Sequence, residues 1–486
     1  MLLRIINSKF FVPASILLII LLCILTRLPQ LLSPHFLLDE DECVLGLMAK
    51  HTIEAKGIPV FFYGQTYGFS AIETLLISAA YFLFGYSDYS VKLPMFLLFI
   101  TGILFFYKTL IICTDKKWVP LIITILLICS PAWAVWSMKA RGGYLTAFCL
   151  SNTCTWLLFK KAGNIIFRWV LLGFLSALIF YSQPLWLPGL APLLCYQLFN
   201  GKAHTKSFNF LVGTMPVVIL LETVKRSIYH MWSPKVFGIQ PHISNAVHLL
   251  YDHLHGYYYL DFIYIAPLVC KVFAVLFAAL ILGLLGMAIW YSFKNWKPHQ
   301  LFITSALSVL LILSYSIFLT DHAPRYLLPL TGCTLLTLFF LLNRLHIRYA
   351  LSVAIPLIII GSFSLLTFRD YEFLPYSKKQ LLGCVNYLQQ HQLNYIFCND
   401  VPQEWQILFY SREEVICRES NNIDRYPLYI QQVDSAYTVS PVHTAVVDFS
   451  GDLKDMEPNK TILVSGIFFV LEQPGRQLLA DMEMKF

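Results

Sequence analysis

The sequence predicts a polytopic α-helical membrane protein with an α/β domain at its C-terminal end. Of its 486 residues, 57% are hydrophobic and only 13% are charged, whereas soluble proteins average about 25% charged residues. Residues 368–486 differ from the rest because they are polar and contain only short apolar runs. The net charge of +7 is small for this length, so the composition does not favour a nucleic-acid partner.

The first 367 residues contain the apolar segments that membrane spans require, about 20 residues each. The candidate spans are residues 10–32, 91–113, 118–137, 142–159, 167–183, 186–200, 208–223, 263–293, 301–319, 326–342 and 349–367, about eleven transmembrane helices in all. The further apolar segment 69–85 is short and contains Glu73. We expect this segment to lie in the outer membrane interface and not to cross the bilayer.

The basic residues between the spans predict how the chain is oriented. They lie in short loops, at Lys116 and Lys117, Lys160 and Lys161, Lys202 and Lys206, Lys294 and Lys297, and Arg344 and Arg348. If segment 69–85 does not span, all these loops face one side, and the positive-inside rule makes that side the cytoplasm. We therefore expect a cytoplasmic N-terminus, with loop 33–90, loop 225–262 and residues 368–486 on the outer side.

Residues 368–486 predict a small extracytoplasmic domain. A helical pattern at residues 378–390 precedes three short apolar strands, at residues 395–398, 415–417 and 444–449. Alternating helices and strands are typical of an α/β fold. The chain therefore divides into a transmembrane module, residues 1–367, and an α/β domain, residues 368–486.

Four consecutive carboxylates follow the first predicted span. They are Asp39, Glu40, Asp41 and Glu42. An acidic run usually lies in a solvated loop, but the residues after it are apolar at helical spacing and predict an amphipathic helix on the membrane surface. The helix dipole favours carboxylates at such an N-terminus. With the interfacial helix that contains Glu73, this helix would frame an acidic cavity where a hydroxyl compound from water meets a lipid-borne substrate.

Three cations occur where predicted spans emerge on the outer side, namely Lys139, Arg141 and Arg325. Cations on this side run against the positive-inside bias, which favours a functional role. For Lys139 the alternative is snorkelling of a long side chain at a helix end. The adjacent Gly142 and Gly143 would permit either close approach of an anion to the backbone or close helix packing.

Several of these segments together resemble one known family. Asp41-Glu42, a small residue, a helix ending in Ala and then Gly57-Ile58-Pro59 resemble the first outer loop of the GT-C superfamily. That superfamily includes protein O-mannosyltransferases and lipid A aminoarabinose transferases. The segment Ala323–Leu330, with Arg325 and Tyr326, is similar to its Arg-Tyr-x-x-Pro segment.

Two further stretches are similar to a bacterial subgroup of the same superfamily. They are residues 63–68 with the nearby Glu73, and residues 136–144. The resemblance covers about residues 1–370 and does not extend into the C-terminal domain.

The resemblance implies a membrane glycosyltransferase that moves a sugar, with inversion, from a polyprenyl-phosphate donor to an extracytoplasmic glycan, lipid or protein acceptor. This reaction needs a carboxylate that takes the proton of the acceptor hydroxyl, which typically contributes about 10²–10⁴-fold in rate. From the register of the family's acidic pair we expect Asp41 to be this base and Glu42 to assist it. Asp39 and Glu40 would then support the pair.

The resemblance also implies a binding site for the lipid phosphate. Charge that develops on a phosphate leaving group is stabilised by cations. We expect Lys139, Arg141 and Arg325 to bind the donor, together with Tyr326 and Glu73.

A divalent metal is the one cofactor left open. Relatives often carry another acidic residue where this chain has the basic stretch 139–143, which favours phosphate contact over metal binding there. Loop 225–262 contains five histidines. Few of them share helical spacing with another ligand, so a zinc site in this loop is not favoured.

Two other classes of function remain as alternatives. One is a flippase or other transporter of lipid-linked sugars, and the other is a scaffold whose C-terminal domain binds a partner. Transporters tend to show inverted repeats and ionisable residues at mid-membrane, whereas the charges here gather at the outer face. Abundant Lys, Asn and Ile favour a bacterial protein. We therefore expect the bacterial inner membrane, surrounded by membrane lipids, with the site and the C-terminal domain in the periplasm.

Overall fold

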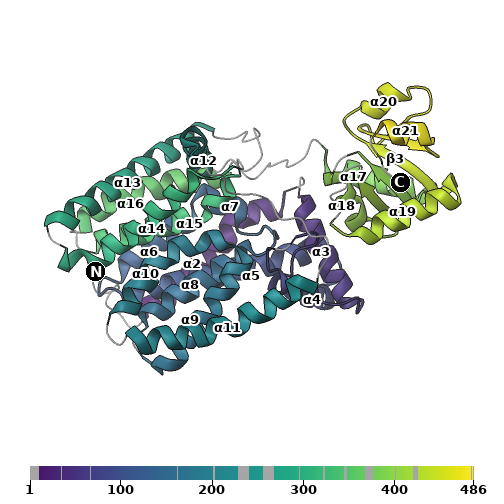
Figure 1. Cartoon of the computed structure of the whole chain (residues 1–486). Helices are drawn as coiled ribbons and strands as arrows, with labels where there is room; N and C mark the ends of the chain where they lie inside the picture. The colour runs from purple at the N-terminus through teal and green to yellow at the C-terminus, as the bar shows by residue number, and fades with distance from the viewer. Residues whose placement is uncertain are drawn as a thin grey trace.

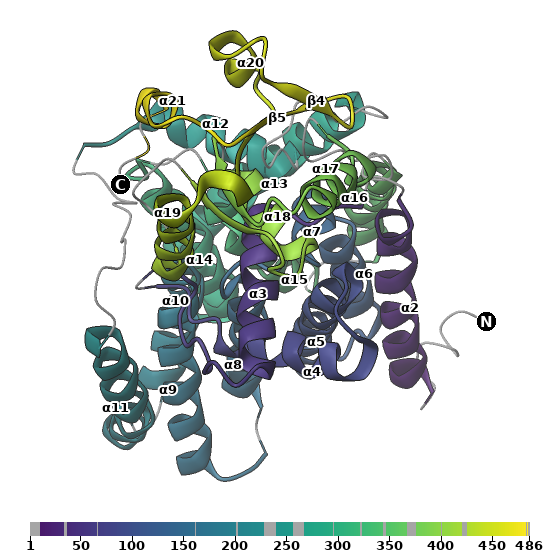
Figure 2. The same cartoon turned by 90° about the vertical axis from the view of Figure 1, so that its right-hand side faces the viewer.

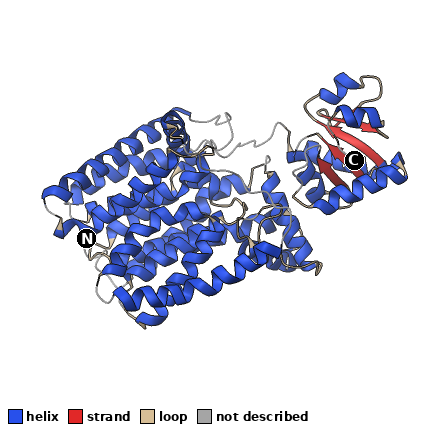
Figure 3. Cartoon of the chain, viewed as in Figure 1, coloured by secondary structure: helices blue, strands red, loops and turns tan. Residues whose placement is uncertain are grey.

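The structure, a computed structural model, describes residues 10–33, 36–65, 67–160, 162–200, 203–227, 240–255, 267–294, 296–320, 323–343, 347–366, 376–399, 401–419, 425–482 and 484. They form a bundle of helices with a small domain at one end of the bundle (Figure 1). Strands are confined to the small domain (Figure 3). This architecture confirms the predicted fold class.

Each predicted span overlaps one or two helices of the bundle. The bundle consists of α2 (Phe11–Leu31), α3 (Glu40–Ile53), α4 (Ala71–Phe84), α5 (Asp88–Ile112), α6 (Trp118–Ile128), α7 (Pro131–Trp136), α8 (Tyr144–Phe159), α9 (Ile165–Ser182), η1 (Pro184–Trp186), α10 (Leu187–Phe199), α11 (Ala203–Ser227), α12 (Ile243–His255), α13 (Pro267–Lys294), η2 (Lys297–His299), α14 (Gln300–Ser316), η3 (Pro324–Leu327), α15 (Leu328–Leu342) and α16 (Ile347–Leu366). Within the described ranges, seven helical segments are long and apolar enough to cross a membrane, those of α2, α5, α9, α11, α13, α14 and α15.

The predicted span 118–137 is interrupted, and a buried arginine stabilises the interruption. Pro131 begins α7 directly after α6 has ended, since proline is well accommodated at the start of a helix. The fully buried Arg27 of α2 donates hydrogen bonds to the carbonyl oxygens of Ile128 (2.8 Å) and Trp133 (2.9 Å). It also donates to the hydroxyl of Ser137 at 2.9 Å. The bond to Ile128 satisfies a carbonyl group at the end of α6, and together the bonds fix the start of loop 137–143.

Loop 33–90, which the sequence places on the outer side, forms the two short helices α3 (Glu40–Ile53) and α4 (Ala71–Phe84). Each has 14 residues, too few to span a bilayer, and the hydroxyl of Ser78 in α4 donates to the carbonyl oxygen of Ala49 in α3 at 3.1 Å. Helix α3 differs from the amphipathic surface helix that the sequence predicts, because every residue from Glu42 to Ala49 is buried. The C-terminal domain covers part of the surface that a membrane-surface helix would turn to water.

The C-terminal domain is a five-stranded sheet with helices around it. Its elements are α17 (Lys378–Gln390), β1 (Tyr395–Cys398), α18 (Val401–Tyr410), β2 (Ile416–Glu419), α19 (Pro427–Val439), η4 (Pro441–His443), β3 (Thr444–Asp448), α20 (Asp452–Met456), β4 (Ile462–Val464), β5 (Phe468–Glu472) and α21 (Arg476–Asp481). The strand order is β2-β1-β3-β5-β4. Strand β1 is parallel to β2 and β3, with Tyr395 opposite Ile416 and Thr444, whereas β5 is antiparallel to β3 and β4.

Helix α18 of the C-terminal domain packs on α3, next to which it lies in Figure 2. The contact requires Gly46, because a Cβ atom there would lie 2.5 Å from the ring of Phe409. The side-chain amide of Gln406 donates to the carbonyl oxygen of Leu38 at 2.6 Å. The domain is therefore attached to the bundle directly beside the four carboxylates.

Candidate active site

The four consecutive carboxylates divide into two pairs, because α3 begins among them. Asp39 is the N-cap residue and accepts a hydrogen bond from the backbone N–H of Glu42 at 2.9 Å. Glu42 in turn accepts from the backbone N–H of Asp39 at 3.2 Å, which completes a capping box. Both side chains are buried, whereas those of Glu40 and Asp41 are 26% and 18% exposed. The second pair is therefore the more accessible one.

Two lysines neutralise the buried pair. The ammonium of Lys139 lies 2.6 Å from Oδ2 of Asp39 and 4.0 Å from Oε2 of Glu42. Lys92, in the first turns of α5, forms an ion pair with Oε1 of Glu42. The backbone N–H of Ala140 donates to the same oxygen at 3.3 Å. Buried carboxylates are tolerated when they are paired in this way, so this half of the cluster holds α3, α5 and loop 137–143 together.

Two arginines contact the exposed pair. The Nε of Arg141 lies 2.5 Å from Oδ2 of Asp41, and the Nη1 of Arg425 lies 2.5 Å from Oδ1 of the same carboxylate. Arg141 also lies 3.7 Å from Glu40 through Nη2 and 3.9 Å from Asp39 through Nε. Asp41 thus lies between guanidinium groups from the bundle and from the C-terminal domain.

The two exposed carboxylates have pKa values shifted in opposite directions. Burial opposes ionisation of Asp41, but the charges of Arg141 and Arg425 outweigh it and hold the pKa of Asp41 below its usual range. For Glu40, burial and the neighbouring charge of Asp41 raise the pKa to about 7. Asp41 is therefore ionised at neutral pH, whereas Glu40 is partly protonated.

Arg325 and Tyr326 come to the same place from η3. The guanidinium of Arg325 hydrogen-bonds the side chain of Tyr144 and is close enough to Asp41 to favour its ionised form. It also lies 5.3 Å from the ring centroid of Tyr326. Tyr326 is buried, and its carbonyl oxygen accepts from the hydroxyl of Tyr315 at 2.5 Å. Arg325 therefore joins the carboxylate cluster, and the predicted role of Tyr326 in donor binding stays a prediction.

Glu73 is fully buried against the start of α8. Its Oε1 accepts from the backbone N–H of Thr146 at 3.3 Å and from its hydroxyl at 3.2 Å. Burial raises the pKa of Glu73 to about 7, although hydrogen bonds from the backbone around Gly143 oppose the shift. These contacts hold the N-terminal turn of α8, directly after Arg141. The predicted role of Glu73 in substrate binding stays a prediction.

Gly142 and Gly143 shape the loop that carries Arg141. Their φ angles are +56° and +93°, in the region that favours glycine. A Cβ on Gly143 would lie 3.0 Å from the carbonyl oxygens of Phe69 and Ser182, and one on Gly142 would lie 3.1 Å from the ring of Phe62. The two glycines therefore permit close packing of this loop on its neighbours, and approach of an anion to its backbone stays a prediction.

Two cations of this site were not predicted, Lys92 and Arg425. A signal for Lys92 was present, because it is a basic residue at the outer end of the predicted span 91–113. Arg425 had no such signal, because its contact with Asp41 depends on how the C-terminal domain packs on the bundle. The structural role of Asp39 and Glu42 could also have been predicted, because Asp-x-x-Glu before an apolar helix has the spacing of a capping box.

One group of side chains in the described part of the chain has the spacing of a metal site. Ligand atoms of His51, Glu54 and Glu413 lie within 4.8 Å of one another. Other groups already engage them. The ring nitrogens of His51 lie 2.8 Å from the hydroxyl of Tyr63 and 2.8 Å from Glu413. Lys50 lies 2.8 Å from Glu54 and also pairs with Glu413. The group thus connects α3 to the C-terminal domain, and its lysine disfavours a cation.

The carboxylate cluster likewise contains its own counter-charges. Each of the four carboxylates lies within 4.0 Å of a lysine or arginine nitrogen. We therefore assign no step to a metal ion, and the participation of a divalent metal stays a prediction. The histidine loop lies partly outside the described residues. Of its described part, His253 is buried and contacts the hydroxyl of Thr331 at 3.0 Å.

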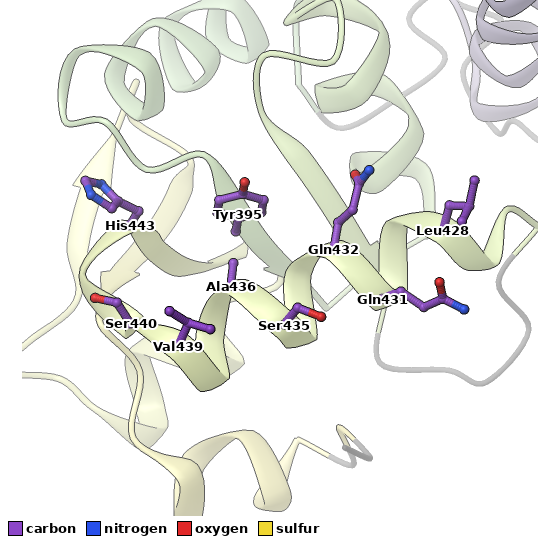
Figure 4. Close-up of a pocket in the computed structure, with 9 residues that line it drawn as sticks. All are labelled: Tyr395, Leu428, Gln431, Gln432, Ser435, Ala436, Val439, Ser440 and His443. Carbon is purple, nitrogen blue, oxygen red and sulfur yellow. The ribbon is translucent and has the colours of Figure 1, made fainter. Parts of the chain in front are cut away.

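A separate groove of about 590 Å³ lies on the C-terminal domain (Figure 4). It follows α19 and is lined by Tyr395, Leu428, Gln431, Gln432, Ser435, Ala436, Val439, Ser440 and His443. None of the cluster's charged residues lines it, so it is not part of the carboxylate site.

Comparisons with known proteins found similar solved structures. No family model and no curated protein matches it. The crystal structure of ArnT from Cupriavidus metallidurans bound to undecaprenyl phosphate matches with a TM-score of 0.60 and 12% sequence identity, over 96% of this chain and 99% of that chain. The apo state of the same protein matches with a TM-score of 0.61 and 12% identity, over 96% and 98%. At this identity the likeness establishes the fold alone, so the chain has the fold of ArnT.

Proposed function

We propose that this chain, a polytopic helical membrane protein with the fold of ArnT, is a membrane glycosyltransferase. It transfers a sugar from a polyprenyl-phosphate donor to a hydroxyl group of an extracytoplasmic glycan, lipid or protein. The observation that carries the proposal is Asp41, an ionised and partly exposed carboxylate held between two guanidinium groups at one end of the bundle. A second support is that the matched ArnT structure is bound to undecaprenyl phosphate.

The proposed reaction is a single displacement at the anomeric carbon. The acceptor oxygen forms a bond to that carbon while the bond from the carbon to the phosphate oxygen breaks, and its electron pair goes to the phosphate. The proton of the acceptor hydroxyl goes to a carboxylate. One displacement inverts the anomeric configuration and forms no covalent enzyme intermediate.

Asp41 is the proposed base. It is ionised at neutral pH and can therefore accept a proton, and the acceptor proton becomes more acidic as the new bond forms. Glu40 takes the assisting role that the sequence-based hypothesis gave to Glu42, because Glu42 is buried and paired with Lys92. Asp39 and Glu42 then act indirectly, by fixing the start of α3.

Arg141 and Arg325 are the proposed contacts of the donor phosphate. Both lie beside Asp41, and a guanidinium binds phosphate oxygens through two parallel N–H groups. Lys139 is buried against Asp39, so we assign it a supporting electrostatic role instead of direct contact. We place this site on the periplasmic face of a bacterial inner membrane, following the distribution of basic loops.

The test is a transfer assay with the purified protein in liposomes. The substrates are a panel of undecaprenyl-phosphate monosaccharides, offered with oligosaccharide, lipid and peptide acceptors. Under the proposal the protein consumes at least one donor, releases undecaprenyl phosphate and forms a product of inverted configuration. A transporter would instead move the intact donor across the bilayer. Donor movement without release of undecaprenyl phosphate would contradict the proposal in favour of a transporter.

A further inference from the structure

Arg425 belongs to the C-terminal domain and reaches the carboxylate cluster of the bundle. The sequence resemblance to the GT-C superfamily does not extend into this domain. The side chain of Arg425 is 19% exposed, and its Nη1 lies 2.5 Å from Oδ1 of Asp41. The guanidinium also lies 5.2 Å from the ring centroid of Phe62, on the first outer loop. A cation held between a carboxylate and an aromatic ring has its position fixed on two sides.

The bundle is shaped to receive this residue. Gly64 has a φ of +71°, and a Cβ on it would lie 2.7 Å from the Cα of Arg425. The loop that contains Gly64 thus packs directly on the backbone of Arg425. The next residue, Tyr426, stacks on Tyr63 with ring centroids 4.9 Å apart.

A second set of contacts fixes the domain near the C-terminal end of α3, at His51. Glu413 accepts from the hydroxyl of Tyr429 at 2.8 Å and pairs with His51 at 2.8 Å. His51 is buried, so the histidine, the glutamate and the tyrosine form a continuous chain from α3 to α19. Because α19 follows Arg425 directly, these contacts limit how far Arg425 can move away from Asp41.

We infer that the C-terminal domain completes the active site by placing Arg425 against Asp41, and that Arg425 is a positioning residue for this base. The inference rests on the proposed function. Arg141 holds Oδ2 of Asp41 and Arg425 holds Oδ1, so the two arginines together fix the plane of the carboxylate. With Arg425 removed, the carboxylate turns about its bond to Arg141, and its pKa rises because one of the nearby positive charges is lost.

The first test does not depend on transfer activity. A water-soluble carbodiimide reacts with protonated carboxyl groups, so its reaction with Asp41 at about pH 6 reports the pKa and the shielding of that residue. The extent of labelling is read by peptide mass spectrometry, with the exposed Asp455 as internal reference. Arg425→Ala is compared with Arg425→Lys and with Arg476→Ala, which removes an exposed arginine of the same domain. A melting curve of each variant shows whether the protein is folded.

The inference predicts that Arg425→Ala raises labelling of Asp41 about tenfold, as a pKa increase of about one unit would. Arg425→Lys gives an intermediate value because it retains the charge, and Arg476→Ala matches the wild type. Unchanged labelling in a folded Arg425→Ala protein overturns the inference, whatever the transfer rates are.

The second test is the kinetics of sugar transfer in the same variants. Because the pKa of Asp41 lies far below the assay range, the comparison is made at neutral pH: Arg425→Ala lowers kcat more than it changes KM, and Arg425→Lys restores part of kcat. An unchanged kcat in a folded Arg425→Ala protein contradicts a positioning role. If labelling changes as expected but the wild type transfers sugar from no donor, the proposed function fails while the contact between Arg425 and Asp41 stands.

Discussion

Arg425 lies 2.5 Å from Asp41, although 384 residues separate the two in the sequence. Asp41 belongs to the start of α3, whereas Arg425 precedes α19 of the C-terminal domain. The four carboxylates thus have different partners. Asp41 contacts an arginine of the C-terminal domain, whereas Asp39 and Glu42 pair with lysines of the bundle. Substitutions in the two halves should therefore have different effects, on stability in the buried half and on chemistry in the exposed half.

The first prediction concerns the buried ion pair of Lys92 and Glu42. Lys92→Met leaves the carboxylate of Glu42 without its nearest cation, which should lower the free energy of unfolding by about 3 kcal/mol. The double variant with Glu42→Gln should recover much of this loss because no uncompensated charge remains. Thermal melts in detergent measure both. Lys108→Met is the control, because Lys108 is an exposed lysine of the same helix. Equal melting temperatures for Lys92→Met and Lys108→Met would refute the prediction.

The second prediction concerns pH and Glu73. Its carboxyl group has a pKa of about 7 in the folded protein, against an ordinary value of 4.5. Between these pH values the folded state keeps a proton that the unfolded state has lost, so stability from this group falls as pH rises from about 4.5 to about 7. Glu73→Gln cannot titrate. The decrease in melting temperature across this range should therefore be smaller in Glu73→Gln than in the wild type.

The control for this pH dependence is Glu457→Gln, which changes a carboxylate on the surface of the C-terminal domain that is 33% exposed. It should follow the wild-type curve. If Glu73→Gln also follows that curve, Glu73 does not retain its proton in the folded protein.

The third prediction concerns the packing of α18 on α3. Gly46→Ala places a Cβ about where the ring of Phe409 lies, at 2.5 Å, so the C-terminal domain must shift away from α3. The shift withdraws Arg425 from Asp41, and labelling of Asp41 by carbodiimide should increase. Phe409→Ala in the same protein makes room and should restore low labelling. Gly475→Ala, at a glycine with no atom within 4 Å of the added Cβ, is the matched control. Labelling in Gly46→Ala equal to that in Gly475→Ala would show that the packing is not coupled to the site.

Local sequence patterns predicted much of the fold. The helical pattern 378–390 became α17, and residues 395–398 became β1, because alternation and periodicity depend on near neighbours. The helices of the bundle were predicted from the length of their apolar segments. The break between α6 and α7 was not predicted, because its stability depends on Arg27, which lies 101 residues from Ile128 in the sequence.

The sequence predicted the part of the candidate site that local patterns indicate, and it missed the part that depends on contacts between distant segments. Arg141 and Arg325 were identified from charge at the predicted outer ends of spans, and Asp41 from the resemblance to the GT-C acidic pair; the structure brings the three together. The assignment of Glu42 to the reacting pair depended on where α3 begins, which helical register alone did not decide. Arg425 lies in another domain, and no local pattern encodes how two domains pack.

The central claim is that Asp41 is the base of a sugar transfer. The most direct measurement is the initial rate of transfer by Asp41→Asn in liposomes at neutral pH. Asp455→Asn, an exposed aspartate of α20, is assayed in parallel as the matched control. The asparagine keeps the shape of the side chain but cannot take the acceptor proton, so the rate should fall about 100-fold or more, while Asp455→Asn transfers at the wild-type rate. Transfer by Asp41→Asn within about twofold of the wild type, far less than the loss of a base produces, would contradict the claim.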